Sequence, residues 1–258
     1  MLPVQYAGST SRDPSPALWG EIPLPLLMRG VGGTARFDDF DQGLGGYDTL
    51  AGTGCTTDQA GDAFGAVKLT LDGTADDECS VQFNGAEYQI DTSTPGRFAY
   101  ECRVKKASVA DNVVGLFAGL SQAGQAATGT LVNTTGALES ADFIGFHVPM
   151  GTSGATCNFV WRVSGQAMVT GMAGVHTFAA DTYVRLGFLY DTYEPEPAKR
   201  LKIFKNGVLQ TTYGTDTQLA AATFPDLTDL APIFHAKMGS GASASSAHMD
   251  WWQVSQER

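Results

Sequence analysis

Alternation of apolar and polar residues, repeated from residue 36 to the end of the chain, is the feature that most constrains the fold. Residues 98–105 and 184–190 place apolar side chains at every second position, which is the period of a β-strand. No long segment shows a helical period. The segments with strand character are 66–71, 80–83, 88–91, 98–105, 113–120, 143–149, 158–163, 166–170, 184–190, 201–205, 208–210, 231–237 and 248–254. The chain is therefore predicted to be all-β.

Turn signals separate many of these segments. Asn206-Gly207 lies between 201–205 and 208–210, and both residues tolerate the positive φ of a tight hairpin. Ser164-Gly165 predicts a second hairpin between 158–163 and 166–170. About a dozen strands in one chain favour an antiparallel sandwich of two large sheets. We expect this sandwich to occupy residues 36–258 as one domain.

Residues 1–35 differ from the rest, because they hold five of the 11 prolines. Proline forces extended backbone at itself and at its predecessor, so segment 22–28 is predicted to be an extended apolar strip and not a helix. Such an arm can pack on its own domain or on a neighbouring subunit, and the sequence leaves both open. The predicted partner-binding residues are Trp19, Ile22, Leu24, Leu26, Leu27, Met28 and Trp252.

The composition argues against some classes of binding partner. Charged residues make up 17% of the chain, against about 25% in typical soluble proteins, which suits a chain with much of its surface covered, either by a second sheet or by neighbours. The formal net charge of -11 disfavours nucleic acid and anionic membrane. No apolar run approaches the ~18 residues that span a bilayer, and the first 19 residues do not form a secretory signal. We therefore expect a protein made and assembled in a cytoplasm.

The four cysteines are widely spaced, which argues against a zinc finger or ribbon. Cys102 and Cys157 fall in alternating apolar runs and are predicted to be buried thiols, while one disulfide stays open. Two acidic clusters, Asp38-Asp39-x-Asp41 and 72–78, could hold calcium, but neither matches a known calcium loop. We expect solvated acidic turns, and no metal or cofactor.

Motifs for hydrolases, metalloproteases and phosphate loops are absent from the sequence. Glycanases need two carboxylates on one strand face, and the nearest approach to such a pair is Glu87 with Asp91. We therefore expect no enzymatic activity and no catalytic residue. His147 and His235 lie in apolar strands, as core or edge histidines do. The pair Trp251-Trp252 places one indole on each face of a strand, so one is expected in the core and one outside.

Five strings carry a resemblance to known proteins. They are 142–147 (DFIGFH), 183–188 (YVRLGF), 202–207 (KIFKNG), 230–234 (LAPIF) and 249–254 (MDWWQV). The region 36–256 resembles concanavalin A-like jelly rolls and, more narrowly, a group of tailed-bacteriophage proteins associated with the phage head. The strings are strand motifs, so they speak more for the fold than for the role.

The resemblance implies a structural protein of the virion, a capsid decoration or cement protein that binds the major capsid protein or other virion proteins. A homo-oligomer would suit a capsid surface. The alternative is a lectin-like adhesin that binds a host-surface glycan, which predicts a concave sheet with at least two outward aromatic residues. A glycan hydrolase is a third alternative, and it requires two carboxylates in one groove.

Overall fold

The computed structural model describes residues 12–29, 32–60, 65–151, 154–212, 214–240 and 243–257. Most of the regular structure in these ranges is β. The strands are β1 (Gly33–Asp38), β2 (Tyr47–Ala51), β3 (Thr56–Gln59), β4 (Val67–Leu71), β5 (Glu78–Phe83), β6 (Arg97–Lys106), β7 (Val114–Ser121), β8 (Phe143–Val148), β9 (Thr156–Arg162), β10 (Val169–Thr177), β11 (Val184–Asp191), β12 (Leu201–Lys205), β13 (Val208–Thr212), β14 (Ala231–Met238) and β15 (Ser245–Glu257).

The helices are short. They are α1 (Pro16–Trp19), α2 (Leu24–Arg29), α3 (Gln125–Thr128) and α4 (Asp216–Leu219), with a 3-10 turn η1 (Pro197–Lys199). None of the helices in the described ranges is long and apolar enough to cross a membrane.

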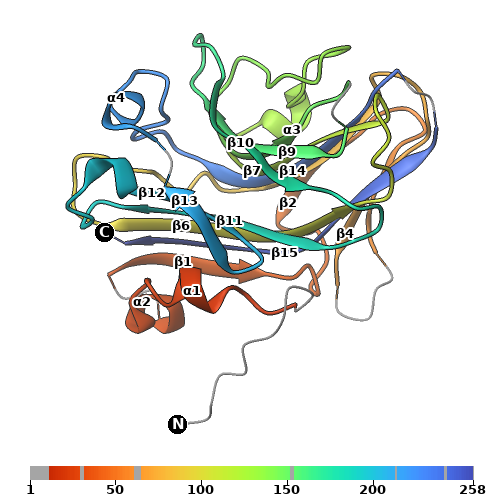
Figure 1. The fold of residues 1–258 in the computed structure, drawn as a ribbon. Helices are drawn as coiled ribbons and strands as arrows, with labels where there is room; N and C mark the ends of the chain where they lie inside the picture. The colour runs from red at the N-terminus through yellow and green to blue at the C-terminus, as the bar shows by residue number, and fades with distance from the viewer. Residues whose placement is uncertain are drawn as a thin grey trace.

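Two antiparallel sheets lie face to face and form a sandwich (Figure 1). The eight-stranded sheet has the order β13-β12-β11-β6-β15-β4-β3, with β1 added beside β15. The seven-stranded sheet has the order β10-β9-β8-β7-β14-β5-β2. The predicted all-β sandwich is therefore confirmed. Sequence neighbours often lie in different sheets, as β5, β6 and β7 do, so each sheet mixes early and late parts of the chain.

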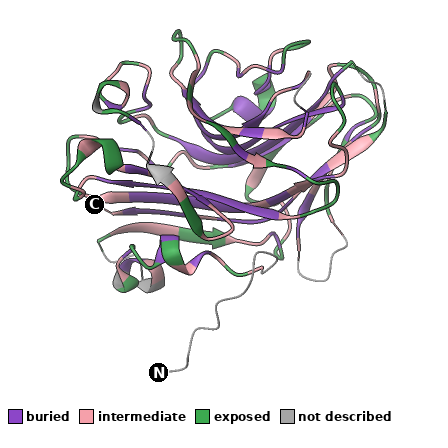
Figure 2. Ribbon diagram, viewed as in Figure 1, coloured by how far each residue is buried: buried purple, intermediate pink, exposed green. Residues whose placement is uncertain are grey.

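The main core lies between the sheets, where period-two alternation places every second side chain. In β6, Tyr100, Cys102 and Val104 belong to this core, while Ala99 packs on the opposite face of the sheet, as predicted. Figure 2 shows the central strands of both sheets buried along most of their length. Cys102 and Cys157 are fully buried, and all four cysteines are free thiols.

The predicted hairpins are both present, with one change. Asn206 and Gly207 have positive φ angles of 50° and 79° and connect β12 to β13. The Ser164-Gly165 turn joins β9 and β10, but β10 starts only at Val169, so the connection is longer than two residues. Segment 88–91, predicted to be a strand, makes only isolated bridges from Tyr88 and Ile90.

The N-terminal segment differs from the extended arm that its prolines predicted. Residues 16–19 and 24–29 are helical, and the amides of Leu26 and Leu27 donate to the carbonyl of Pro23. Pro25 is tolerated because it lies in the first turn, where a helix does not need the missing N–H. The two helices lie against the outer face of the eight-stranded sheet, below it in Figure 1.

The outer face of the seven-stranded sheet is covered too, by the connection between β7 and β8. This connection, residues 122–142, includes α3 and lies above β7 and β9 in Figure 1. Its side chains and the sheet share a second apolar cluster that contains Phe117, Leu131, Leu138, Ala141, Phe143, Val160 and Ile233. Segments of the same chain therefore cover both outer faces of the sandwich.

Candidate functional site

The structure brings most of the predicted partner-binding residues together, but it buries them within the chain. Trp19, Ile22 and Leu26 are each less than 8% exposed and pack on Ala99, Leu189 and Phe204 of the eight-stranded sheet. Leu27 is partly buried beside them, whereas Leu24 is 64% exposed. The side chain of Met28 lies outside the described part of the structure. The arm thus docks in cis, the first of the two alternatives.

A buried carboxylate fixes the arm to the sheet. Glu101 of β6 accepts hydrogen bonds from the backbone amide of Ser15 at 2.8 Å, from the Ser15 hydroxyl and from the Trp19 indole at 2.7 Å. Burial raises the pKa of Glu101, while these donors and the nearby Arg185 oppose the rise. Arg185 donates in turn to the carbonyl of Asp13.

A β-bulge explains the two tryptophans. The register of β15 against β6 shifts between Met249 and Trp251, so the inward series continues with Trp252 in place of Trp251. Trp252 is 1% exposed in the main core, so within the folded chain it offers no surface to a partner. Trp251 lies outside the core but is also buried, with its indole N–H bonded to the carbonyl of Arg12.

The platform of outward aromatic residues that the lectin-like alternative predicted is not exposed on the described strands of the seven-stranded sheet. Phe117 and Phe143 point outward from β7 and β8, but both are fully buried under residues 122–142. Polar contacts hold this cover: Gln82 bonds to Ser121 and to the backbone of 122 and 126, and His147 bonds to the carbonyl of Gly136 at 2.6 Å.

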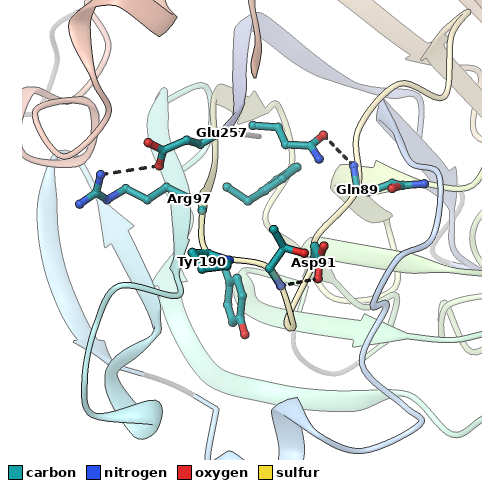
Figure 3. Close-up of a pocket in the computed structure, with 10 residues that line it drawn as sticks. Gln89, Asp91, Arg97, Tyr190 and Glu257 are labelled. Atoms are coloured by element: carbon teal, nitrogen blue, oxygen red, sulfur yellow. Dashed lines mark hydrogen bonds and ion pairs between the residues drawn. The ribbon is translucent and has the colours of Figure 1, made fainter. Parts of the chain in front are cut away.

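An open cavity of about 260 Å³ lies instead at one end of the sandwich (Figure 3). The start of β6, the end of β11, the end of β15 and the loop before β6 meet there. Its lining residues are Gln89, Asp91, Thr94, Pro95, Gly96, Arg97, Phe98, Tyr190, Gln256 and Glu257. Phe98 and Tyr190, both 2% exposed, provide apolar surface, and the remaining side chains bring amides, carboxylates and a guanidinium.

The charged groups of this cavity are held in place. Arg97 pairs with Asp191 at 3.3 Å and with Glu257 at 3.7 Å, and its guanidinium lies 4.8 Å from the centre of the half-exposed Tyr193 ring. On the other wall, Gln256 accepts from the backbone amide of Gln89 at 3.0 Å. Figure 3 shows the ion pair of Arg97 with Glu257 and the hydrogen bond between Gln256 and Gln89.

Hydrogen bonds stabilise the ionised form of Asp91. One of its oxygens accepts from the hydroxyl and amide of Ser93 and from the amide of Thr94, at 2.7–2.9 Å. The Ser93 and Thr94 side chains lead the causes that hold the pKa of Asp91 well below its usual range. A carboxyl that must donate a proton needs the opposite shift, so Asp91 is unsuited to general acid catalysis.

The predicted carboxylate pair is split between two places. Asp91 lines the cavity just described, whereas Glu87 lines a separate hollow of about 510 Å³ with the acidic residues Asp38, Asp39 and Asp41. The sequence therefore identified one cavity residue, Asp91. It gave no signal for Arg97, Gln256 or Glu257, because those residues come from the ends of strands that are distant in sequence.

The strand histidines are buried as expected. Burial lowers the pKa of His147 to about 4. Burial and the neighbouring Lys237 lower the pKa of His235 to about 3, so its 3.5 Å approach to Glu78 joins a neutral ring to a carboxylate. The carboxylate of Glu78 pairs with Lys237 at 2.9 Å.

Comparison with known proteins gives the fold and little beyond it. No protein-family model matches the sequence, and no curated protein matches it. Among solved structures, peanut lectin bound to a nine-residue peptide aligns with a TM-score of 0.56 at 12% identity, over 86% of this chain and 97% of the lectin. The carbohydrate recognition domain of Emp47p aligns with a TM-score of 0.55 at 11% identity, over 85% and 93%.

A phage protein is also similar. The carbohydrate esterase vb_24B_21 from the Shiga toxin-encoding bacteriophage phi24B aligns with a TM-score of 0.50 at 16% identity, over 87% of this chain and 97% of the esterase. The fold is a concanavalin A-like jelly roll. This jelly roll has lectins among its structural neighbours, and segments of its own chain pack on both outer faces of the sandwich.

Proposed function

We propose that this jelly roll is a non-enzymatic, lectin-like adhesin of a virus particle that binds a host-surface glycan in the cavity between β6, β11 and β15. The observation that carries the proposal is the lining of that cavity, which combines Pro95, Phe98 and Tyr190 with polar side chains held by hydrogen bonds and ion pairs. Binding pockets for small molecules combine these two features.

Sugar chemistry matches this lining. Sugar hydroxyls both donate and accept, so adjacent hydroxyls can bond to a carboxylate and an amide at the same time. Asp91 and Glu257 supply carboxylates, and Gln256 supplies an amide. The C–H face of a sugar ring can pack on the apolar part of the lining, where Pro95 is exposed beside Phe98 and Tyr190.

Two further observations support a binding role over hydrolysis. The low pKa of Asp91 keeps it an acceptor, and Glu257 has Arg97 as a partner, so neither resembles a general acid. The lectin-like neighbours support glycan binding, and the virion setting rests on the sequence resemblance to tailed-phage proteins.

A glycan array tests the proposal with the full chain and one blocking variant. Thr94 is exposed at the cavity wall, so Thr94→Trp should fill the cavity and reduce glycan affinity at least tenfold. Thr177→Trp is the matched control, because Thr177 is exposed at the end of β10 and does not line the cavity. It should bind like the wild type, and both variants should keep the wild-type melting temperature within a few degrees.

Equal binding by Thr94→Trp and the wild type would contradict the proposal, and so would an array of bacterial surface glycans without a hit. Shortening of a bound glycan during incubation would contradict its non-enzymatic part.

A second candidate, a capsid decoration protein, is favoured by exposed apolar side chains near the arm. Leu24 of α2 and Phe37 of β1 are 64% and 48% exposed. Large exposed apolar groups suit an interface core, here with the major capsid protein or a second copy of the chain. If this candidate is correct, the wild type co-sediments with capsids and a Leu24→Glu, Phe37→Glu double variant does not. Glycan binding without co-sedimentation favours the first candidate.

A further inference from the structure

Two thiols and two carboxylates meet at the opposite end of β15 from the glycan cavity. Cys55 immediately precedes β3, and Asp72 directly follows β4. Asp77 precedes β5, which contains Cys79. The Cys55 sulfur and one oxygen from each aspartate all lie within 4.8 Å of one another. Three groups from three separate segments therefore converge on one point.

A second thiol lies beside this group. Cys79 is fully buried, its sulfur neighbours that of Cys55, and its S–H donates to the carbonyl of Thr70 at 3.3 Å. Cys55 is 7% exposed, while Asp77 is half-buried and Asp72 is exposed. The sulfurs thus lie on the inner side and the carboxylates on the outer side, which leaves a path from solvent.

The local backbone fits closely around the carboxylates. Gly54 has a φ of +79°, and a methyl group there would lie 2.1 Å from an oxygen of Asp72. The Thr74 amide donates to the other Asp72 oxygen at 2.8 Å, which fixes the carboxylate. A side chain at position 54 would fill the space between the turn and Asp72, so glycine keeps the two in contact.

Negative charge accumulates here without a cation nearby. Within the described residues, neither Asp72 nor Asp77 is paired with Lys, Arg or His. A bound dication would pair with both carboxylates and would stabilise the thiolate of Cys55.

We propose that Cys55, Cys79, Asp72 and Asp77 form a tetrahedral site for a divalent transition metal, with zinc as the best fit. Two thiolates select zinc over calcium and magnesium, which prefer oxygen ligands alone. Ligand atoms about 2.0–2.3 Å from zinc lie about 3.3–3.8 Å apart, so the atoms of Cys55, Asp72 and Asp77 need to close by about 1 Å. The Cys79 thiol would exchange its hydrogen bond to the carbonyl of Thr70 for the metal.

The site would join the two sheets. Cys55 leads into β3, at the edge of the eight-stranded sheet, and Cys79 lies in β5 of the seven-stranded sheet. A metal held by both cysteines would therefore fasten the edge of the sandwich, independently of any glycan bound near the other end of β15.

Cobalt and zinc titrations of the full chain, stripped with a chelator under reducing conditions, test the site. One equivalent of Co²⁺ should produce a thiolate-to-cobalt charge-transfer band, which Zn²⁺ then displaces. Zn²⁺ should also raise the melting temperature. Cys55→Ser should lose the band, and Asp72→Asn, a milder change at an exposed residue, should weaken Zn²⁺ binding at least tenfold.

Asp58→Asn is the matched control, because Asp58 is an exposed carboxylate of β3 outside the cluster, and this variant should bind like the wild type. Absence of the charge-transfer band in the wild type would overturn the proposal. So would unchanged Zn²⁺ binding by Asp72→Asn, or a Cys55–Cys79 disulfide in protein isolated from a reducing cytoplasm. None of these readouts involves glycan binding, so the two proposals stand or fall separately.

Discussion

Trp19 donates its indole N–H to the buried carboxylate of Glu101 at 2.7 Å, and this bond links the N-terminal segment to the centre of the eight-stranded sheet. Without the N-terminal segment, the Glu101 carboxylate would be exposed on a largely apolar sheet face. Together with Ser15, the bond makes the arm part of the domain and not a free extension.

The arm should therefore detach when this bond is removed. Trp19→Phe keeps an aromatic ring but leaves Glu101 with one donor fewer, which should lower the stability of the docked arm by about 1–3 kcal/mol. Limited proteolysis should cleave residues 12–29 faster in the variant than in the wild type. Leu24→Ala, at an exposed position of the same segment, is the control and should show wild-type cleavage. Equal cleavage of Trp19→Phe and the wild type would contradict the anchoring role.

Acid should weaken the cover over the seven-stranded sheet through His147. Burial lowers its pKa to about 4 from 6.5 in the unfolded chain, so the unfolded state binds more protons between these values. The neutral ring therefore contributes about 3 kcal/mol to the free energy of unfolding above pH 6.5, and this contribution is lost as the pH falls toward 4. His147→Gln does not titrate, so urea unfolding should show a shallower pH dependence. Parallel curves for the two proteins would disprove this assignment.

Lys106 should make the stability of the fold depend on pH in the alkaline range. It is fully buried, and its ammonium donates to the carbonyls of Val114 and Gly154 at 2.6 Å. Burial lowers its pKa to about 8 from 10.5, so the unfolded state binds more protons between these values and stability rises with pH there. The stability difference between wild type and Lys106→Met should shift by about 3 kcal/mol in favour of the wild type from pH 8 to 10.5. A difference that stays constant over this range would show that the lysine does not titrate there.

Two paired glycines allow β7 and β8 to lie beneath the ring of Phe117. A methyl group at Gly145 would lie 2.6 Å from the Cα of Gly119 and 3.1 Å from that ring. Gly145→Ala should therefore destabilise the fold by about 1–3 kcal/mol, measured by chemical unfolding. Gly45→Ala is the control, because nothing lies within 4 Å of the added methyl group, and it should be neutral or slightly stabilising. An unchanged free energy of unfolding in Gly145→Ala would contradict this prediction, because it would show that the two strands can move apart without loss of stability.

Local patterns and tertiary contacts determined different parts of this protein. Alternation in segments such as 98–105, and the Asn206-Gly207 turn, determined the strands, their inward faces and the β12–β13 hairpin, because these depend only on near neighbours in the sequence. Local reasoning failed at Pro25, because a proline is tolerated in the first turn of a helix. It also failed at Trp252, because the bulge at Asp250 reverses the alternation.

The candidate sites depended on the tertiary structure. Arg97, Asp191 and Glu257 meet only because β6 pairs with both β11 and β15, and Cys55 meets Cys79 only where the two sheets face each other. The sequence carries the chemistry of each side chain. Which side chains share a cavity, and which segments cover the outer faces of the sheets, follows from long-range contacts that no local period specifies.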